Sequence, residues 1–172
     1  MHQKRIRSIS MLVCLLCMAT CLPMMASAQA QQEPPWRVEP QLPPERAEMS
    51  VGKTSLDVEL AVTTNQQTLG LGYRNGLAPG TGMLFVDTGA TERTFWMKGM
   101  RFCLDIVWVQ DGKIVGAAEN ACPDPDGTAD QDRARFASPG AVTYVLEVPA
   151  GWLKQYGYGT GTVVVVPDNL AP

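Results

Sequence analysis

Aromatic, cationic and carboxylate side chains gather in one short stretch, TFWMKGMRFCLDIVWV, residues 94–109. The ring of Trp96 is suited to stacking on sugars or cations, and the charge of Lys98 could contact an anion. A purely structural role is the alternative, in which Lys98 is an exposed charge that discourages aggregation between strands. The stretch therefore predicts either a binding site or a set of residues that brace one another.

Two carboxylates interrupt otherwise apolar strands, Asp105 in LDIVWV and Glu147 in VLEV. Because an unpaired buried carboxylate costs several kcal/mol, each should lie beside a cation or hydrogen-bond donor. We expect Asp105 to brace neighbouring loops or to contact a ligand, and Glu147 to cap the helix that follows Pro149. If the two converged on one cavity, they could divide acid and base roles in an enzyme. The candidate partners of Asp105 are Lys98, Arg74 and Arg101.

Arg74 stands at the end of a predicted helix, immediately before the helix-stop pair Asn75-Gly76. A cation at a helix C-terminus is favourable by roughly 0.3–1 kcal/mol, which explains Arg74 without a ligand. Its functional interpretation is an anion contact. The candidate ligand-binding residues are Arg74, Trp96, Lys98, Asp105 and Glu147.

Residues 1–30 have the pattern of a secretory signal peptide. Three basic residues precede an apolar run over 9–22, and A-x-A cleavage sites follow at 26–30. The run is shorter than the roughly 18 residues that indicate a membrane span. A retained anchor and a lipoprotein acylated at Cys21 are the weaker alternatives. We therefore expect an exported protein, periplasmic or extracellular, with no membrane span after cleavage.

Loss of residues 1–30 would change the chemistry of the chain. The formal charge moves from −3 (14 basic, 17 acidic) to −6 (11 basic, 17 acidic), which argues against a nucleic-acid partner. His2, the single histidine, is also lost, and with it the commonest general base and metal ligand. The acidic segment 119–132 is a poor calcium loop, because Gly127 falls at position 4 from Asp124 rather than 6. We expect no metal and no cofactor, and we favour a protein that is not an enzyme.

Cys103 and Cys122 remain, and an even pair in an oxidising compartment predicts a disulfide. A redox-active pair is the alternative, but such pairs usually have C-x-x-C spacing. Asp111-Gly112 predicts a tight hairpin turn. Paired positions would then sum to about 223, which places Cys103 opposite Asn120 and close to Cys122 if the strand slips or bulges slightly.

The composition divides the chain into four parts: a signal peptide (1–30), a Pro-rich tether (31–50), one globular domain (51–167) and a tail (168–172). Alternation and turn residues predict strands at 54–63, 82–87, 94–97, 102–110, 113–119, 142–148 and 162–166. Short helices are predicted at 65–73 and 149–156. The fold class is therefore mainly β (α+β), a small curved sheet or barrel with about seven strands and two short helices.

Several segments, in order and spacing, resemble the DUF192 family. They are LGLGYR (69–74), GMLF (82–85), FWMK (95–98), LDIVWV (104–109), GKIV (112–115), VLEVPAG (145–151) and YGYGTGTVVVV (156–166). The resemblance spans about Leu56 to Val166 and implies a compact β-rich domain, but no established reaction. The chain departs from the family pattern at Gly72, at Gly99-Met100 and at Gly161-Thr162, so a ligand contact made there in relatives would be changed.

These observations favour a binding module for a small polar or anionic ligand. A structural or partner-binding envelope protein is the first alternative, with an envelope component as its partner. An enzyme that uses Asp105 and Glu147 as a carboxylate pair is the second, and it requires both carboxyl groups to face one cavity within about 10 Å. The sequence does not indicate an oligomeric state.

Overall fold

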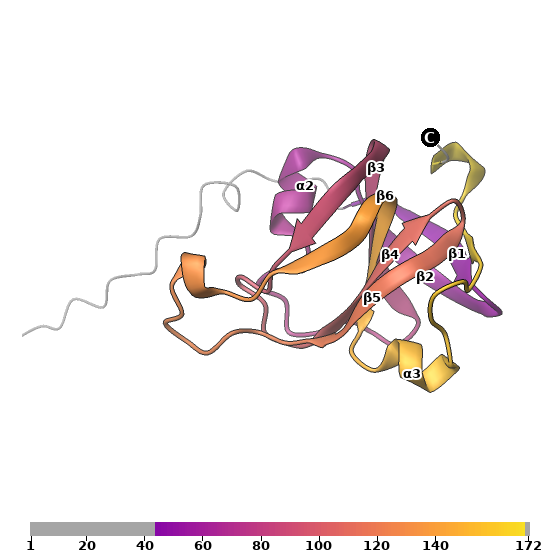
Figure 1. The fold of residues 1–172 in the computed structure, drawn as a ribbon. Helices are drawn as coiled ribbons and strands as arrows, with labels where there is room; N and C mark the ends of the chain where they lie inside the picture. Colours follow the sequence, from indigo (N-terminus) through magenta and orange to yellow (C-terminus); the bar gives the residue numbers. More distant parts are fainter. Residues whose placement is uncertain (1–43, 171–172) are drawn as a thin grey trace, which may run out of the picture. The chain divides into compact units, whose positions relative to one another are not determined.

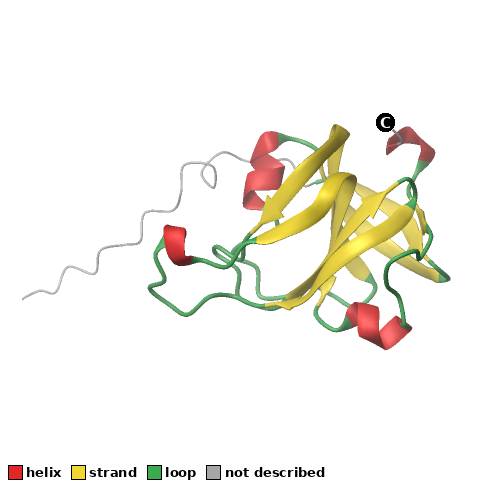
Figure 2. Cartoon of the chain, viewed as in Figure 1, coloured by secondary structure: helices red, strands yellow, loops and turns green. Residues whose placement is uncertain are grey.

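A computed structural model describes residues 44–170. Figure 1 shows that this part of the chain is built mainly from strands, and Figure 2 distinguishes them from the short helices. The strands are β1 (Arg46–Val51), β2 (Thr54–Ala61), β3 (Thr81–Phe95), β4 (Leu104–Gln110), β5 (Lys113–Ala121), β6 (Phe136–Pro149) and β7 (Val164–Val165). The helices are α2 (Thr64–Leu69) and α3 (Trp152–Tyr156), with 3-10 turns η1 (Asp130–Asp132) and η2 (Asp168–Leu170). The predicted mainly β single domain with two short helices is confirmed.

All seven strands form one sheet in the order β5-β4-β6-β3-β2-β1-β7. The β2–β3 pair is parallel and the other pairs are antiparallel. The segment that leads into β7, at one end of this order, also contacts β5 at the other end. The N–H of Gly52, after β1, donates to the Val163 carbonyl, while the N–H of Ile114, in β5, donates to the Thr162 carbonyl. These bonds curl the sheet into a half-barrel whose two edges meet at residues 162–164.

The curled sheet buries apolar side chains on both of its faces. One cluster includes Val58, Leu84, Val107 and Leu146, and the other includes Phe85, Met97, Leu104, Ile106 and Val145. Because successive strand residues point to opposite faces, Val107 and Ile106 belong to different clusters although they are adjacent in β4. Both faces of β4 are covered, so its side chains are almost fully buried from Leu104 to Val109.

The β4–β5 hairpin turns at Asp111 and Gly112, whose φ angles of 51° and 64° are those that a tight hairpin requires. Gln110 pairs with Lys113 as predicted, but two register shifts follow, and Leu104 pairs with Ala121. The sum of paired positions therefore rises from 223 to 225, which brings Cys103 opposite Cys122. Their Cα atoms lie 4.1 Å apart and a disulfide joins them, so the predicted bridge is present.

Several predicted boundaries differ from the structure. The tether prediction to residue 50 is wrong at its end, because β1 begins at Arg46 and pairs with β2. The two predicted strands at 82–87 and 94–97 are one long strand, β3, paired with an equally extended β6. The predicted tail contains η2, and the Leu170 carbonyl accepts a hydrogen bond from Tyr144 Oη at 2.5 Å. The predicted signal peptide lies outside the described residues.

The two helices are shorter than predicted, since α2 covers Thr64–Leu69 rather than 65–73 and α3 covers Trp152–Tyr156 rather than 149–156. Arg74 therefore lies beyond the end of α2 and not at its C-terminus. Helix α2 is capped by Thr63, since the Thr63 hydroxyl accepts from the Gln66 N–H while the Gln66 side chain accepts from the Thr63 N–H. Helix α3 follows Gly151 and ends at Gly157, as the sequence predicted. In Figure 1, α2 and α3 lie at opposite ends of the curled sheet.

Candidate functional site

Asp105 is fully buried in β4 and accepts three backbone hydrogen bonds. One oxygen accepts from the N–H of Asn120 at 2.9 Å and from that of Gly151 at 3.1 Å, while the other accepts from Leu153 at 3.0 Å. Gly151 and Leu153 belong to the start of α3, and Asn120 sits at a bulge in β5 with a φ of 52°. Asp105 is therefore a brace between the hairpin and α3, as one of its two predicted roles required.

The cations predicted to partner Asp105 lie elsewhere. Lys98 pairs with Asp130, Arg74 with Glu59, and the Arg101 guanidinium donates to the Asn75 side chain. The three candidate cations were therefore wrong, whereas the predicted hydrogen-bond donors are present. Backbone N–H groups at a bulge and a helix start satisfy the carboxylate instead, and residue patterns do not show which N–H groups a fold will leave unpaired.

Glu147 and Asp105 face opposite sides of the sheet. Glu147 pairs with Ile106 across the β4–β6 ladder, so its side chain shares the face of Ile106, and Asp105 points the other way. The geometric requirement of a carboxylate-pair enzyme is not met, and that alternative is wrong. The predicted capping role of Glu147 is also wrong, because Asp105 contacts the start of α3.

Glu147 is nonetheless an unusual carboxyl group. Its side chain is almost fully buried, and this burial raises its pKa to about 8. The nearby charge of Arg74 has the opposite effect and lowers the pKa of Glu147. The apolar residues on this face include Met83, which pairs with Glu147 across the β3–β6 ladder, and Ile106. At neutral pH the group is therefore mainly the uncharged acid, which can donate a hydrogen bond.

A cavity of about 50 Å³ borders Glu147 on this face of the sheet. Its walls come from α2 and the loop after it, from β3, and from the segment that follows β3. The side chains that give it chemical character are Glu147, Lys98 and Trp96, and the apolar walls include Phe85, Phe95 and Met100. Three of the predicted site residues therefore meet at one cavity.

Two cations lie close to the ring of Trp96 at the surface. Lys98 Nζ is 5.0 Å from the ring centroid, and the Arg135 guanidinium carbon is 4.3 Å from it. The indole is 39% exposed, so part of the ring remains open to solvent. Two cations thus lie beside the cavity on an otherwise acidic chain, and they can attract an anionic or strongly polar group when the ion pair of Lys98 with Asp130 opens.

The loop between β5 and β6 covers this region and brings Arg135 to Trp96. Asp130 in η1 pairs with both Lys98 and Arg133, and these contacts lower the pKa of Asp130. Arg133 also pairs with Asp124, at 3.5 Å. The acidic loop is therefore held in place by ion pairs.

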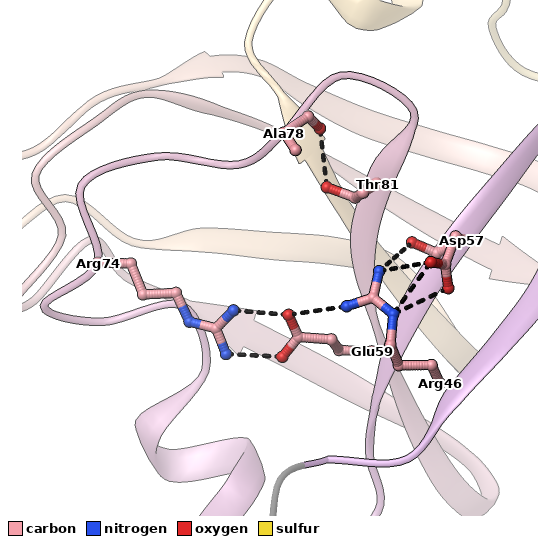
Figure 3. Close-up of polar contacts among 6 residues, drawn as sticks. All are labelled: Arg46, Asp57, Glu59, Arg74, Ala78 and Thr81. Carbon is pink, nitrogen blue, oxygen red and sulfur yellow. Dashed lines mark hydrogen bonds and ion pairs between the residues drawn. The ribbon is translucent and has the colours of Figure 1, made fainter.

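Arg74 belongs to a separate ion-pair network on the surface of β1 and β2, drawn in Figure 3. Its guanidinium makes two 2.7 Å hydrogen bonds to Glu59, and Glu59 also contacts Arg46, which pairs with Asp57. Arg74 chiefly, with Arg46, lowers the pKa of Glu59. Arg74 thus acts on the cavity through its charge at Glu147, and its hydrogen bonds are made to Glu59.

The loops that carry the cavity residues are tied together at Tyr73 and Gly99. The Tyr73 N–H donates to the Gly99 carbonyl at 2.8 Å, and both residues have positive φ angles, 65° and 74°. A Cβ atom at Gly99 would lie 3.0 Å from the Tyr73 ring. This close approach explains why the chain has glycine at one of the positions where it departs from the DUF192 pattern.

Sequence reasoning missed Arg135, Asp130 and Glu59. Glu59 was detectable, because it alternates with the apolar residues of β2 and so had to lie on the opposite face with a partner. Arg135 and Asp130 lie in a loop without periodicity, and only the folded loop brings them to Trp96.

A family model named DUF192, described as an uncharacterized ACR, matches residues 47–166. The chain belongs to the DUF192 family. Within the described part of this DUF192 protein, no group of three or more His, Cys, Asp or Glu residues is placed to hold a metal ion. None of its described helices is long and apolar enough to cross a membrane.

Two crystal structures are similar to this DUF192 domain. A proposed transcription regulator from Sinorhizobium meliloti is 33% identical, with a TM-score of 0.63, and the match covers 72% of this chain and 95% of the other. A protein of unknown function from Novosphingobium aromaticivorans is 26% identical, with a TM-score of 0.64, and the match covers 74% and 95%. No curated protein matches the chain.

Proposed function

We propose that this domain is an exported binding module for a small polar or anionic ligand, held at the cavity beside Glu147. The observation that carries the proposal is the combination at one place of a cavity, a buried carboxyl group with a pKa of about 8, and the side chains of Lys98 and Trp96. Perturbed titratable groups that border a cavity with convergent polar residues are typical of binding sites.

The chemistry of the site suits an oxygen-rich group. The protonated carboxyl group of Glu147 donates a hydrogen bond to a carbonyl, carboxylate or phosphate oxygen, and Lys98 supplies a positive charge. The cavity volume of about 50 Å³ lies far below the roughly 300–1,000 Å³ of pockets that enclose a whole small molecule. The cavity therefore takes one terminal group, while the rest of the ligand lies against the exposed part of the Trp96 ring.

Lys98 can be released to a ligand at little cost. Its ion pair with Asp130 is exposed, with the two side chains 42% and 50% accessible, and exposed pairs contribute about 0–1 kcal/mol. Arg133 also contacts Asp130, so that carboxylate would keep a cationic partner when Lys98 turns to an anion.

Export and the choice of ligand class rest on further observations. The signal-like residues 1–30 and the Cys103–Cys122 disulfide support an oxidising compartment. The description of the Sinorhizobium relative would suggest a nucleic-acid partner, but the net charge of −3, or −6 without residues 1–30, disfavours binding to a polyanion. A partner-binding envelope protein remains the alternative, and it requires no small ligand.

The test is a binding screen on matched lysine variants. Acetate, succinate, inorganic phosphate, glycerol phosphate and glucose would be titrated while Trp fluorescence and melting temperature are recorded at pH 7. We expect one of the anions to change both signals in the parent protein and in Lys154→Met, a substitution in α3, and to lose most of its effect in Lys98→Met. Equal responses of the two variants, or no response to any compound, would contradict the proposal.

A further inference from the structure

A second hollow lies away from the Glu147 cavity, between α3 and the loop that precedes β3. It has a volume of about 200 Å³ and is lined by Leu77, Pro79, Gly80, Pro149, Ala150, Trp152, Gln155 and Tyr156. The groove is thus bordered by proline rings, by two aromatic rings and by one amide side chain. Grooves of this composition recognise extended proline-rich segments, with rings packing on rings and side-chain donors contacting peptide carbonyls.

The two aromatic residues of the groove, Trp152 and Tyr156, are held in place by packing against each other and against Tyr158. The rings of Trp152 and Tyr156 lie 5.0 Å apart, and Tyr156 stacks on Tyr158 with centroids 5.9 Å apart and planes 12° apart. Tyr158 is fixed in turn, since its hydroxyl accepts from the Lys53 N–H at 3.0 Å. Tyr156 is nevertheless 42% exposed, so a preformed aromatic surface faces solvent.

The side-chain donor at the groove is the amide of Gln155, which can donate to a peptide carbonyl. The indole nitrogen of Trp152 is buried, and Trp152 contributes the surface of its ring to the groove.

We propose that Pro34-Pro35-Trp36 of this same chain docks in the groove between α3 and residues 77–80. The segment immediately before the described residues, 31–43, reads QQEPPWRVEPQLP and has the proline-rich composition that such a groove accepts. In this arrangement the prolines pack between Trp152 and Pro79, and Trp36 extends the aromatic stack at Tyr156.

The reach of the chain selects this proline pair. Glu48 pairs with Asp57, which pairs with Thr81, so two strand spacings of about 4.8 Å separate β1 from the edge of the groove. Pro44 lies four residues before Glu48, about 13 Å along the strand direction, which puts the groove edge about 17 Å from Pro44. An extended proline-rich segment rises about 3.1 Å per residue. Pro40 therefore reaches only about 12 Å, while Pro34 and Pro35 reach about 28–31 Å.

The inference is independent of the proposed ligand site, because the two hollows share no lining residue. Its test is ¹⁹F NMR of the protein as recovered from the expressing cells, labelled with 5-fluorotryptophan, with resonances assigned by single Trp→Phe variants. We expect the Trp36 resonance to move toward that of free tryptophan in Tyr156→Ala and in Pro34→Ala/Pro35→Ala. Lys154→Ala, on the same helix, and Pro40→Ala are the matched controls and should leave it in place.

The buried Trp108 reports on folding in the same spectra, so a shift of Trp36 with Trp108 unchanged shows undocking and not unfolding. A Trp36 resonance at the free position in the parent protein, or one insensitive to Tyr156→Ala, would overturn the proposal. A Trp36 resonance that changes with protein concentration between about 20 µM and 1 mM would also overturn it, because the groove would then hold a second copy of the chain.

Discussion

Asp105 and Glu147 lie on adjacent, paired strands, yet their carboxyl groups point to opposite faces of the sheet. The carboxylate of Asp105 accepts hydrogen bonds from three backbone N–H groups, whereas Glu147 borders a cavity and has a pKa of about 8. Two carboxylates that look equivalent in the sequence therefore have different tasks. One braces the fold, and the other borders a cavity.

Replacing Asp105 by Asn should destabilise the fold strongly. The amide offers a single acceptor oxygen and turns an NH₂ group toward backbone donors, and hydrogen bonds to a charged group contribute about 1.5–3 kcal/mol each. We expect a loss of about 2–4 kcal/mol in the free energy of unfolding, measured by urea denaturation. Asp111→Asn in the hairpin turn is the control and should change stability by less than about 0.5 kcal/mol. Equal midpoints for the two variants would contradict the bracing role.

The stability of the protein should depend on the ionisation of Glu147. The folded-state pKa of about 8 lies above the ordinary value of 4.5, so the native state holds a proton that the unfolded chain releases. The stabilisation is fully present below about pH 4.5 and is lost as pH rises to about 8, at no more than about 1.4 kcal/mol per pH unit.

Glu147→Gln removes this titration. The difference in unfolding free energy between the parent and this variant should fall between pH 5 and 8 and then level off. Urea denaturation at pH 5, 6.5, 8 and 9 measures it. Parallel stability profiles of the two proteins would show that Glu147 does not titrate in this range.

The charge of Arg74 should lower the pKa of Glu147 without a direct hydrogen bond between the two side chains. This charge opposes the effect of burial, so Arg74→Met should raise the pKa of Glu147 further, as read from the carboxyl carbon chemical shift by NMR. Arg46→Met is the matched control, because Arg46 also contacts Glu59 but is not a cause of the Glu147 shift. Each variant should also lose about 1 kcal/mol or less of stability. A pKa of Glu147 that is the same in both variants would contradict the coupling.

The disulfide should stabilise the domain by restricting the unfolded chain. For the separation of 19 residues between Cys103 and Cys122, the expected contribution is about 3 kcal/mol. Cys103→Ala/Cys122→Ala should therefore show a lower denaturation midpoint than the oxidised parent and should not respond to a reductant. A parent protein whose midpoint is unchanged by dithiothreitol would contradict this contribution.

The sequence predicted the sheet well where residue patterns are local. Alternation located β2, Asp111-Gly112 located the hairpin turn, and Gly157 marked the end of α3. The strand β1 was missed because it follows a proline-rich segment and its apolar residues were too few to separate it from the tether. The continuous length of β3 and β6 was missed because the second half of β3 and the first half of β6 are largely exposed. These two halves pair with each other and lack the alternation of a half-buried strand.

The candidate site was predictable only in part, and for a physical reason. The run from Val142 to Val148 is buried on both faces of its strand, so periodicity could not show which side Glu147 occupies. The partners of Asp105 lie 15 to 48 positions away, and their unpaired N–H groups exist only in the folded chain. Trp96 and Lys98 were identified from residue type, whereas Arg135 was not, because a loop brings it to the ring.

The most direct test of the binding site is the pH dependence of anion affinity in the parent protein and in Glu147→Gln. Binding of the tightest carboxylate or phosphate from the screen would be measured by isothermal titration calorimetry between pH 6.5 and 9.5. We predict that the affinity of the parent, divided by that of Glu147→Gln to remove the titration of the ligand itself, falls as pH passes about 8, where Glu147 becomes charged. Affinities that change in parallel with pH, or the absence of binding in both proteins, would contradict a ligand site at Glu147.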